Sequence, residues 1–224
     1  MTTLAAPNAK RKAAARKPRK PAPAVRRTQT QRREATVAKL LDAAAEALID
    51  VGYTGASVQE ICTRAGVSQG ALFRHFSSRM ELMIRVSEHV GDGLIALYQA
   101  DFQRLRSTRH DDLALALQLL RSNVQSRLHQ AWFELLLAAR TDLRLQQALR
   151  PIWQHRDEIV QALARSLLPE AARTLPQFDV IVDTMVTLFH GEAVDRFIRS
   201  DAAAERRRMD WLLQQLREML QRED

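Results

Sequence analysis

The residues from Gln69 to His75 carry side chains with a clear possible use in this chain. The amide of Gln69 can form paired hydrogen bonds with adenine, and the guanidinium of Arg74 can do the same with guanine. Ala71 is small enough to meet a thymine methyl group, and Gly70 allows the backbone to approach another molecule closely. On the outward face of one helix, these groups could read base edges in a DNA major groove.

The surrounding sequence predicts two short helices joined by a tight turn. Ser57 stands three residues before Glu60, which is the spacing of a capping box at a helix start. Gly66 is placed to end that helix in a left-handed conformation, and Ser68 is a favoured N-cap for the next helix. Buried positions at helical spacing are Val58, Ile61, Cys62 and Ala65, then Leu72 and Phe76. Such a pair forms a helix-turn-helix, whose second helix we expect over residues 69–76.

A longer helix is predicted on each side of this unit. The first runs from Arg32 to Val51, where a glycine stops it. The next begins at residue 79, after a second capping-box spacing, and reaches about residue 103. Gly91 and Gly93 weaken its middle, so this region is either a bending point or an accommodation to close packing.

Fixed spacings extend through this region. They are Gly52-Tyr53, Ser57-Val58, Glu60-Ile61, Ala65-Gly66-Val67-Ser68, Gly70, Leu72-Phe73, His75-Phe76, and Ser78-Arg79 before Glu81-Leu82. With these features, residues 31–82 resemble the DNA-binding domain of the TetR family of bacterial repressors. The resemblance covers about a quarter of the chain.

The resemblance implies an all-α fold with an N-terminal three-helix DNA-binding domain and a C-terminal helical domain for effector binding and dimerisation. We therefore expect a basic tail over residues 1–30, the DNA-binding domain over residues 31–78, and the helical domain over residues 79–224. The expected partner of this DNA-binding domain, which we call the head, is double-stranded DNA.

Candidate DNA contacts combine base-reading groups with groups that the resemblance suggests. They are Arg32, Ser57, Val58, Ser68, Gln69, Gly70, Ala71, Phe73, Arg74, His75 and Arg79. Similar proteins carry tyrosine at the position of Phe73, so a hydroxyl contact is missing there. Arg79 opposes the dipole at a helix start, so we expect an external anion as its partner. Two of these residues have alternatives without DNA contact. Arg74 could be a solvated surface charge, and His75 could form its hydrogen bonds within the domain.

The net charge of +8 is concentrated near the N-terminus. Residues 1–33 hold 11 of the 34 Lys and Arg and no acid, so 23 basic and 26 acidic residues remain, a net charge of −3. The prolines and the low-complexity sequence of the first 30 residues predict disorder. We interpret this segment as an arm that follows phosphates and adds affinity more than specificity, or as a solubilising tail.

Composition narrows the class of protein. With 46% apolar residues, the chain can build a sizeable core, while the single cysteine argues against a disulfide framework or a cysteine-based zinc site. The sequence lacks an apolar run long enough for a membrane span, and it shows no phosphate loop, GxSxG elbow or HExxH pair. We expect no catalytic residues, metal or cofactor, and a place in the cytoplasm, at the nucleoid when DNA is bound.

The C-terminal half predicts further helices over residues 113–127, 129–140, 143–168 and 177–199, and a last helix that Asp201 caps and that ends near Arg222. Pro151 should kink or restart the third of these. The last two are amphipathic and can meet their twofold mates as a four-helix bundle, which predicts a homodimer. The alternative is that both apolar stripes are buried within one subunit.

The resemblance also implies an effector site inside these helices. Candidate lining residues are Trp132, Phe133, Trp153, His155, Met185, Phe189 and His190, although side chains of these kinds are more often plain core. Their character suggests an apolar effector.

Together, these features predict a sequence-specific DNA-binding regulator, a repressor that an effector releases from a palindromic operator. One alternative keeps the DNA-binding head but makes the protein an activator, or a nucleoid-like binder whose basic tail dominates affinity. The other two are an enzyme and a helical adaptor without DNA binding. Salt-sensitive binding to one particular duplex would separate the regulator from the adaptor.

Overall fold

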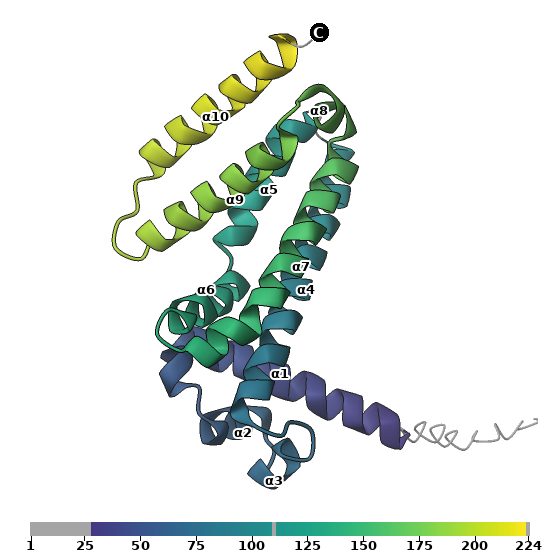
Figure 1. The fold of residues 1–224 in the computed structure, drawn as a ribbon, viewed down its shortest axis with the longest axis vertical. Helices are drawn as coiled ribbons and strands as arrows, with labels where there is room; N and C mark the ends of the chain where they lie inside the picture. The colour runs from purple at the N-terminus through teal and green to yellow at the C-terminus, as the bar shows by residue number, and fades with distance from the viewer. Residues whose placement is uncertain (1–27, 109–110, 223–224) are drawn as a thin grey trace, which may run out of the picture.

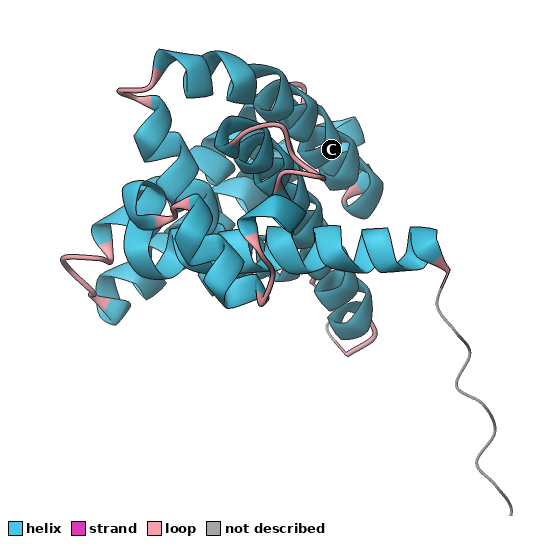
Figure 2. Ribbon diagram, turned by 90° about the horizontal axis from the view of Figure 1, so that it is seen from below, coloured by secondary structure: helices cyan, strands magenta, loops and turns pink. Residues whose placement is uncertain are grey.

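The computed structural model describes residues 28–108 and 111–222, and in this part of the chain it contains ten helices and no strand (Figures 1 and 2). The predicted all-α class is confirmed. Most of the basic tail lies outside the described residues. The helices are α1 (Gln29–Gly55), α2 (Val58–Ala65), α3 (Gln69–Leu72), α4 (Arg79–Arg106), α5 (Asp112–Val124), α6 (Arg127–Ala139), α7 (Leu143–Leu167), α8 (Pro169–Thr174), α9 (Phe178–Asp195) and α10 (Ala202–Arg222).

Local capping chemistry forms the helix-turn-helix. The Ser57 hydroxyl accepts the Glu60 N–H at 3.2 Å, and the Ser68 hydroxyl accepts the Ala71 N–H at 3.2 Å. Gly66 ends α2 at φ 65° and ψ 37°, the left-handed conformation expected of it. The reciprocal half of the predicted capping box is wrong, because the Glu60 carboxylate pairs with Arg64 at 2.7 Å.

The second predicted capping box is also only half formed. The Ser78 hydroxyl accepts the Glu81 N–H at 3.1 Å, but the Glu81 carboxylate accepts from the backbone and hydroxyl of Ser77. A complete capping box instead opens α1, where Thr28 and Gln31 exchange hydrogen bonds of 3.0 and 3.2 Å.

Three helices of the N-terminal half differ in extent or shape from the prediction, and in the C-terminal half α5 and α9 end three and four residues earlier than predicted. Helix α3 ends at Leu72 and continues as a turn through His75. Helix α1 breaks at Gly52, with φ 71°, and adds one more turn. Helix α4 runs without interruption past its glycines, and a Cβ at Gly93 would lie 3.1 Å from Leu128. Close packing against α6 therefore accounts for Gly93.

The largest buried cluster joins the head to the rest of the molecule. It combines α1, α2 and α3 with the first half of α4 and with residues of α6 and α7, such as Leu135 and Leu149. Figure 1 shows α3 at one end of the long axis and α10 at the other. The division at residue 78 stays a prediction, and apolar packing runs across it.

Helix α7 continues through Pro151, so the predicted restart is wrong, while the kink stays a prediction. A proline removes one backbone donor from the helix. The burial of Leu145 and Leu149 in the main cluster, with Ile152 packed beside them, offsets this loss in the first half of α7. Residues 169–174, between two predicted helices, form the short helix α8; Pro169 occupies its first turn, where a missing N–H costs nothing.

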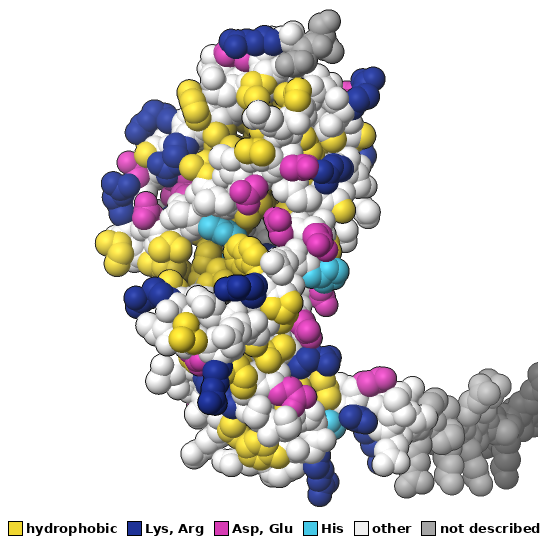
Figure 3. Space-filling model, in the orientation of Figure 1, with side chains coloured by type: hydrophobic (Ala, Val, Ile, Leu, Met, Phe, Trp, Pro, Cys, Tyr) yellow, Lys and Arg dark blue, Asp and Glu magenta, His cyan; other side chains and the backbone are white. Residues whose placement is uncertain are grey.

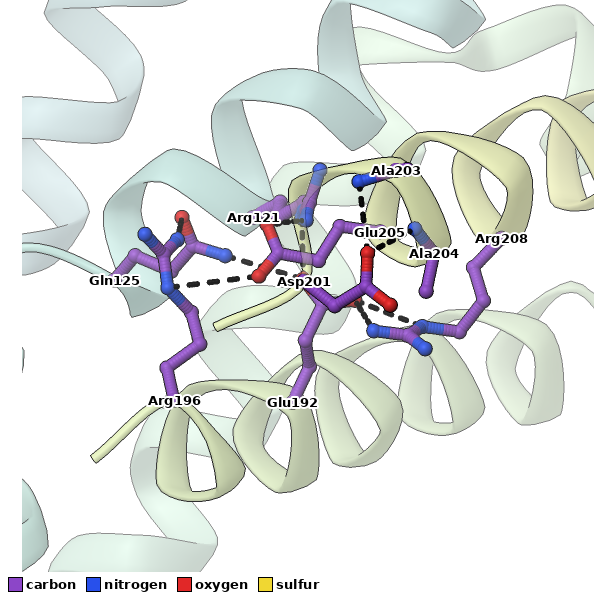
Figure 4. A network of polar contacts seen from close by, with 9 residues as sticks. All are labelled: Arg121, Gln125, Glu192, Arg196, Asp201, Ala203, Ala204, Glu205 and Arg208. Carbon is purple, nitrogen blue, oxygen red and sulfur yellow. Dashed lines mark hydrogen bonds and ion pairs between the residues drawn. The ribbon is translucent and has the colours of Figure 1, made fainter. Parts of the chain in front are cut away.

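Helices α9 and α10 lie side by side and are tied to α5 by buried charges (Figure 4). Arg121 of α5 pairs with Glu192 of α9 and with Glu205 of α10. Arg208 adds a second bond to Glu192 at 2.8 Å. Asp201 caps α10 as predicted, accepting from two backbone N–H groups at 2.9 and 3.1 Å.

Candidate nucleic-acid interface and ligand cavity

Helix α3 and the turn that follows it present most of the predicted base-reading groups on their free side. Gln69, Gly70 and Arg74 are exposed, and Phe73 is 50% exposed although it is a large apolar side chain. Ala71 is half-buried. Leu72 and Phe76 hold the opposite side in the core, as the periodicity predicts. Because one side is held in the core, the exposed side is free to contact another surface.

His75 is not a satisfied partner within the domain. Its Nδ1 atom is buried and lacks a hydrogen-bond partner among the described residues. Because this atom is buried, an outside group cannot reach it, so a phosphate contact of His75 would have to use another atom of this half-buried residue.

The expectation that Arg79 has an external anion as its partner is wrong. Its Nε donates to the carbonyl of Ala56 at 3.0 Å, and a second nitrogen donates to the carbonyl of Tyr53. The guanidinium also stacks 4.3 Å from the centre of the Tyr53 ring. Its partners are thus the free carbonyls at the end of α1, which attract a cation.

Four other candidate contacts lie around this surface. Arg32 is exposed on the first turns of α1. Ser57 and Ser68 are exposed, but their hydroxyls are used as helix caps. Val58 is half-buried against the main core, so packing explains it.

A cavity of about 210 Å³ lies inside the C-terminal helices. Helices α4, α5, α6, α7 and α9 line most of it, and aliphatic side chains dominate its wall. Figure 3 shows hydrophobic side chains around a hollow in the middle of one face, next to a histidine.

Four of the seven predicted effector residues line this cavity: Trp132, Trp153, Met185 and His190. The other three lie elsewhere. Phe133 and Phe189 are buried in the cluster beneath α9 and α10, because they face the opposite side of their helices. The His155 side chain is 74% exposed and lies 3.6 Å from Glu158.

Polar groups gather at one end of the cavity. The Nε2 atoms of His129 and His190 are 3.1 Å apart, and Trp132 and Trp153 stack with ring centres 5.7 Å apart. Arg156 lies over the Trp132 ring at 4.3 Å. Trp132 Nε1, His129 Nδ1 and Arg156 Nη1 are buried without a hydrogen-bond partner in the described part of the chain.

Burial sets the charge of these groups. It lowers the pKa of His129 to about 2, with smaller effects from Arg156 and His190. Burial and then Arg156 lower the pKa of His190 to about 4. Burial lowers the pKa of Arg156 to about 10, so at neutral pH one cation faces two neutral rings.

Two residues that line the cavity, His129 and Arg156, were not predicted from the sequence. A signal for them exists. His129 stands three residues before Trp132, and Trp153 stands three residues before Arg156, a spacing that puts each pair on one helix face. A charged residue beside a tryptophan on such a face could have been singled out.

Among the described residues, no group of three or more His, Cys, Asp or Glu side chains could hold a metal ion. Within the same residues, no helix combines the length and the apolar character needed to cross a membrane.

Known proteins share both the sequence and the arrangement. The sequence model of the bacterial regulatory proteins of the tetR family matches residues 40–86. An uncharacterized HTH-type transcriptional regulator of Mycobacterium tuberculosis is 35% identical over 188 residues, which are 83% of this chain and 95% of that relative. The chain belongs to the TetR family. It is a DNA-binding transcription regulator with an N-terminal helix-turn-helix and a C-terminal helical domain.

Other known proteins match over part of the chain or share the fold. The transcriptional activator FasR of Mycolicibacterium smegmatis is 39% identical over 90 residues, 40% of each chain. A TetR-family regulator from Rhodococcus sp. has a TM-score of 0.64 at 19% identity, covering 84% of this chain and 99% of that one. The multidrug binding protein EbrR, solved with imidazole, has a TM-score of 0.56 at 22% identity, covering 82% and 93%.

Proposed function

We propose that this TetR-family regulator is a homodimeric repressor that binds a palindromic operator through α3 and is released by a small molecule in the cavity. The observation that carries the proposal is the position of α6. His129 and Trp132 on α6 line the cavity, while Leu135 on the same helix is buried in the core of the head. A ligand that moves α6 therefore acts directly on the packing of α1.

Polar contacts strengthen this link. The Glu134 carboxylate of α6 accepts the Tyr53 N–H at 3.2 Å. Arg127 at the start of α6 pairs with Glu46 and Asp50 of α1 at 2.7 and 2.8 Å. An effector changes operator affinity only if it binds the two states of the protein unequally.

We assign specific DNA contacts to Gln69, Gly70, Ala71, Phe73 and Arg74. His75 and Arg32 would contact phosphates. Ser57, Val58, Ser68 and Arg79 would support the head from within, because caps, core packing or α1 carbonyls already occupy them.

The dimer would form through α9 and α10. Apolar side chains exposed there are Val180, Val194, Phe197, Ile198, Trp211 and Met219. The inward stripe of α10, including Met209 and Leu213, is buried within the subunit, so these outward side chains form a separate apolar face that a second copy can cover. We place this regulator in the cytoplasm, with its DNA.

Activation of transcription is the alternative to repression. FasR is described as an activator, and another relative from M. tuberculosis, 32% identical over 76 residues, is described as a repressor. Both matches cover 40% of the relative, so an activator is the second candidate.

Transcription in vitro from the promoter next to the bound site tests the proposal. Protein should lower transcript yield, and an effector that binds the cavity should restore it. Increased yield would show the activator. Unchanged yield at saturated DNA would contradict both.

A further inference from the structure

Arg156 is a half-buried cation without an acidic partner among the described residues. It lies at the polar end of the cavity, over Trp132, and no described carboxylate forms an ion pair with it. Its Nη1 atom is buried and has no hydrogen-bond partner in the described residues. Two carboxylates, Asp157 and Asp183, also line the cavity, but both are exposed and neither is close enough to pair with it.

Arg121, another arginine that is only partly exposed, has acidic partners. The Arg121 side chain is 16% exposed, and Glu192 and Glu205 neutralise it from two helices. An uncompensated buried charge is costly, and proteins usually pair it. The lack of such a pair at Arg156 therefore points to a partner that arrives from outside.

The groups around Arg156 suit an anion. The Trp132 Nε1–H is a donor without a partner, and the neutral His129 and His190 bring no second charge. Together they offer a planar guanidinium and an indole N–H, which match the two oxygens of a carboxylate.

The rest of the cavity suits a long apolar body. Its wall follows α7 from Arg156 to Leu167, about 16 Å at the usual rise of an α-helix. Val160, Leu163 and Leu167 line this stretch, and Ile181 and Met185 of α9 complete the wall.

From this juxtaposition we propose that the effector is an elongated apolar monocarboxylate, whose carboxylate binds Arg156 and Trp132 and whose tail extends along α7 towards α8. The proposal rests on the effector role of the cavity. It replaces a purely apolar effector with one that carries a single anionic end.

Calorimetric titration of the full-length protein with three probes tests it. Decanoate, 1-decanol and decylamine share one tail and differ in the polar end. Decanoate should bind at least about tenfold more tightly than decanol, since a charge-assisted bond replaces a neutral one. Decylamine should bind most weakly. Equal affinity for decanoate and decanol, or no binding of decanoate, would overturn the proposal.

Variants locate the carboxylate. Arg156→Met should reduce decanoate affinity at least about tenfold, to that of decanol, and leave decanol binding within about twofold. Arg156→Lys should keep part of the preference. Arg144→Gln, exposed on the same helix, should change neither affinity. Unchanged decanoate binding by folded Arg156→Met would contradict the assignment; if that variant does not fold, the ranking of probes by the natural protein and by Arg156→Lys decides.

Operator binding separates this proposal from the regulatory one. If decanoate binds through Arg156 but leaves operator affinity unchanged, the ligand class holds and the release mechanism fails. If decanol releases the operator as well as decanoate does, release holds and the ligand class fails.

Discussion

At the scale of single residues, we expect exposed side chains of α3 and of the turn after it to carry sequence discrimination. Gln69→Ala or Arg74→Ala should cost about 1–3 kcal/mol at particular base pairs, because each removes a paired hydrogen bond to one base. Fluorescence anisotropy on an operator and its single-base variants measures this. Gln103→Ala, exposed at the far end of α4, is the control. An equal loss on every sequence would mean that both side chains contact only phosphates.

The buried His129 and the half-buried His190 should make the fold sensitive to acid. Since folding lowers the pKa of His190 to about 4 and that of His129 to about 2 from about 6.5, the unfolded chain binds protons first as pH falls. Their stabilising effect is complete above pH 6.5 and is lost below it, by up to about 1.4 kcal/mol per pH unit for each histidine.

Urea unfolding at pH 7.5, 6, 5 and 4 tests this prediction. Replacing both histidines with glutamine should flatten the decline between pH 6 and 4. His155→Gln, at an exposed site, should leave the decline unchanged. Identical slopes for the double variant and the natural protein would place the acid sensitivity elsewhere.

At the scale of elements, local chemistry predicts what lies within a few residues. The caps at Ser57 and Ser68 and the left-handed Gly66 follow from side chains that act on their own turn. Arg79 shows the opposite case, because its partners stand 23 and 26 residues away and only tertiary packing brings them close. The helices of the head were thus predictable, whereas the role of Arg79 was not.

The cavity shows the same division. Helical periodicity finds the apolar faces, and four predicted residues line the cavity. It does not decide which of two apolar faces meets a cavity, so Phe133 and Phe189 were assigned to the wrong one. Arg156 stands out only when its lack of an acidic partner is seen.

The charged cluster that holds α9 and α10 to α5 should dominate their docking. Arg121→Met leaves Glu192 and Glu205 with fewer partners in a buried place, so the free energy of unfolding should fall by about 3–5 kcal/mol. Chemical unfolding measures the change. Arg104→Met, which breaks an exposed pair with Asp101, should cost no more than about 1 kcal/mol. Similar losses in both variants would contradict the structural role of the cluster.

At the scale of the whole molecule, the exposed apolar face of α9 and α10 should hold two copies together. Trp211→Glu puts a charge on a side chain that is 60% exposed, so it should convert the dimer to monomers with little loss of fold. Sedimentation velocity measures this. Leu143→Glu, at a residue 68% exposed on α7, is the matched control and should stay dimeric. A dimeric Trp211→Glu protein would place the interface elsewhere.

Selection of bound duplexes from a random-sequence pool is the most direct test of the account. The full-length protein should enrich an inverted repeat whose half-site centres are about 34–36 Å apart, or a multiple of that distance, because two α3 helices must enter successive major grooves. A chain that starts at residue 31 should enrich the same repeat with a weaker dependence on salt. Enrichment without a common motif, or loss of the motif when the tail is removed, would contradict the claim that α3 reads the sequence.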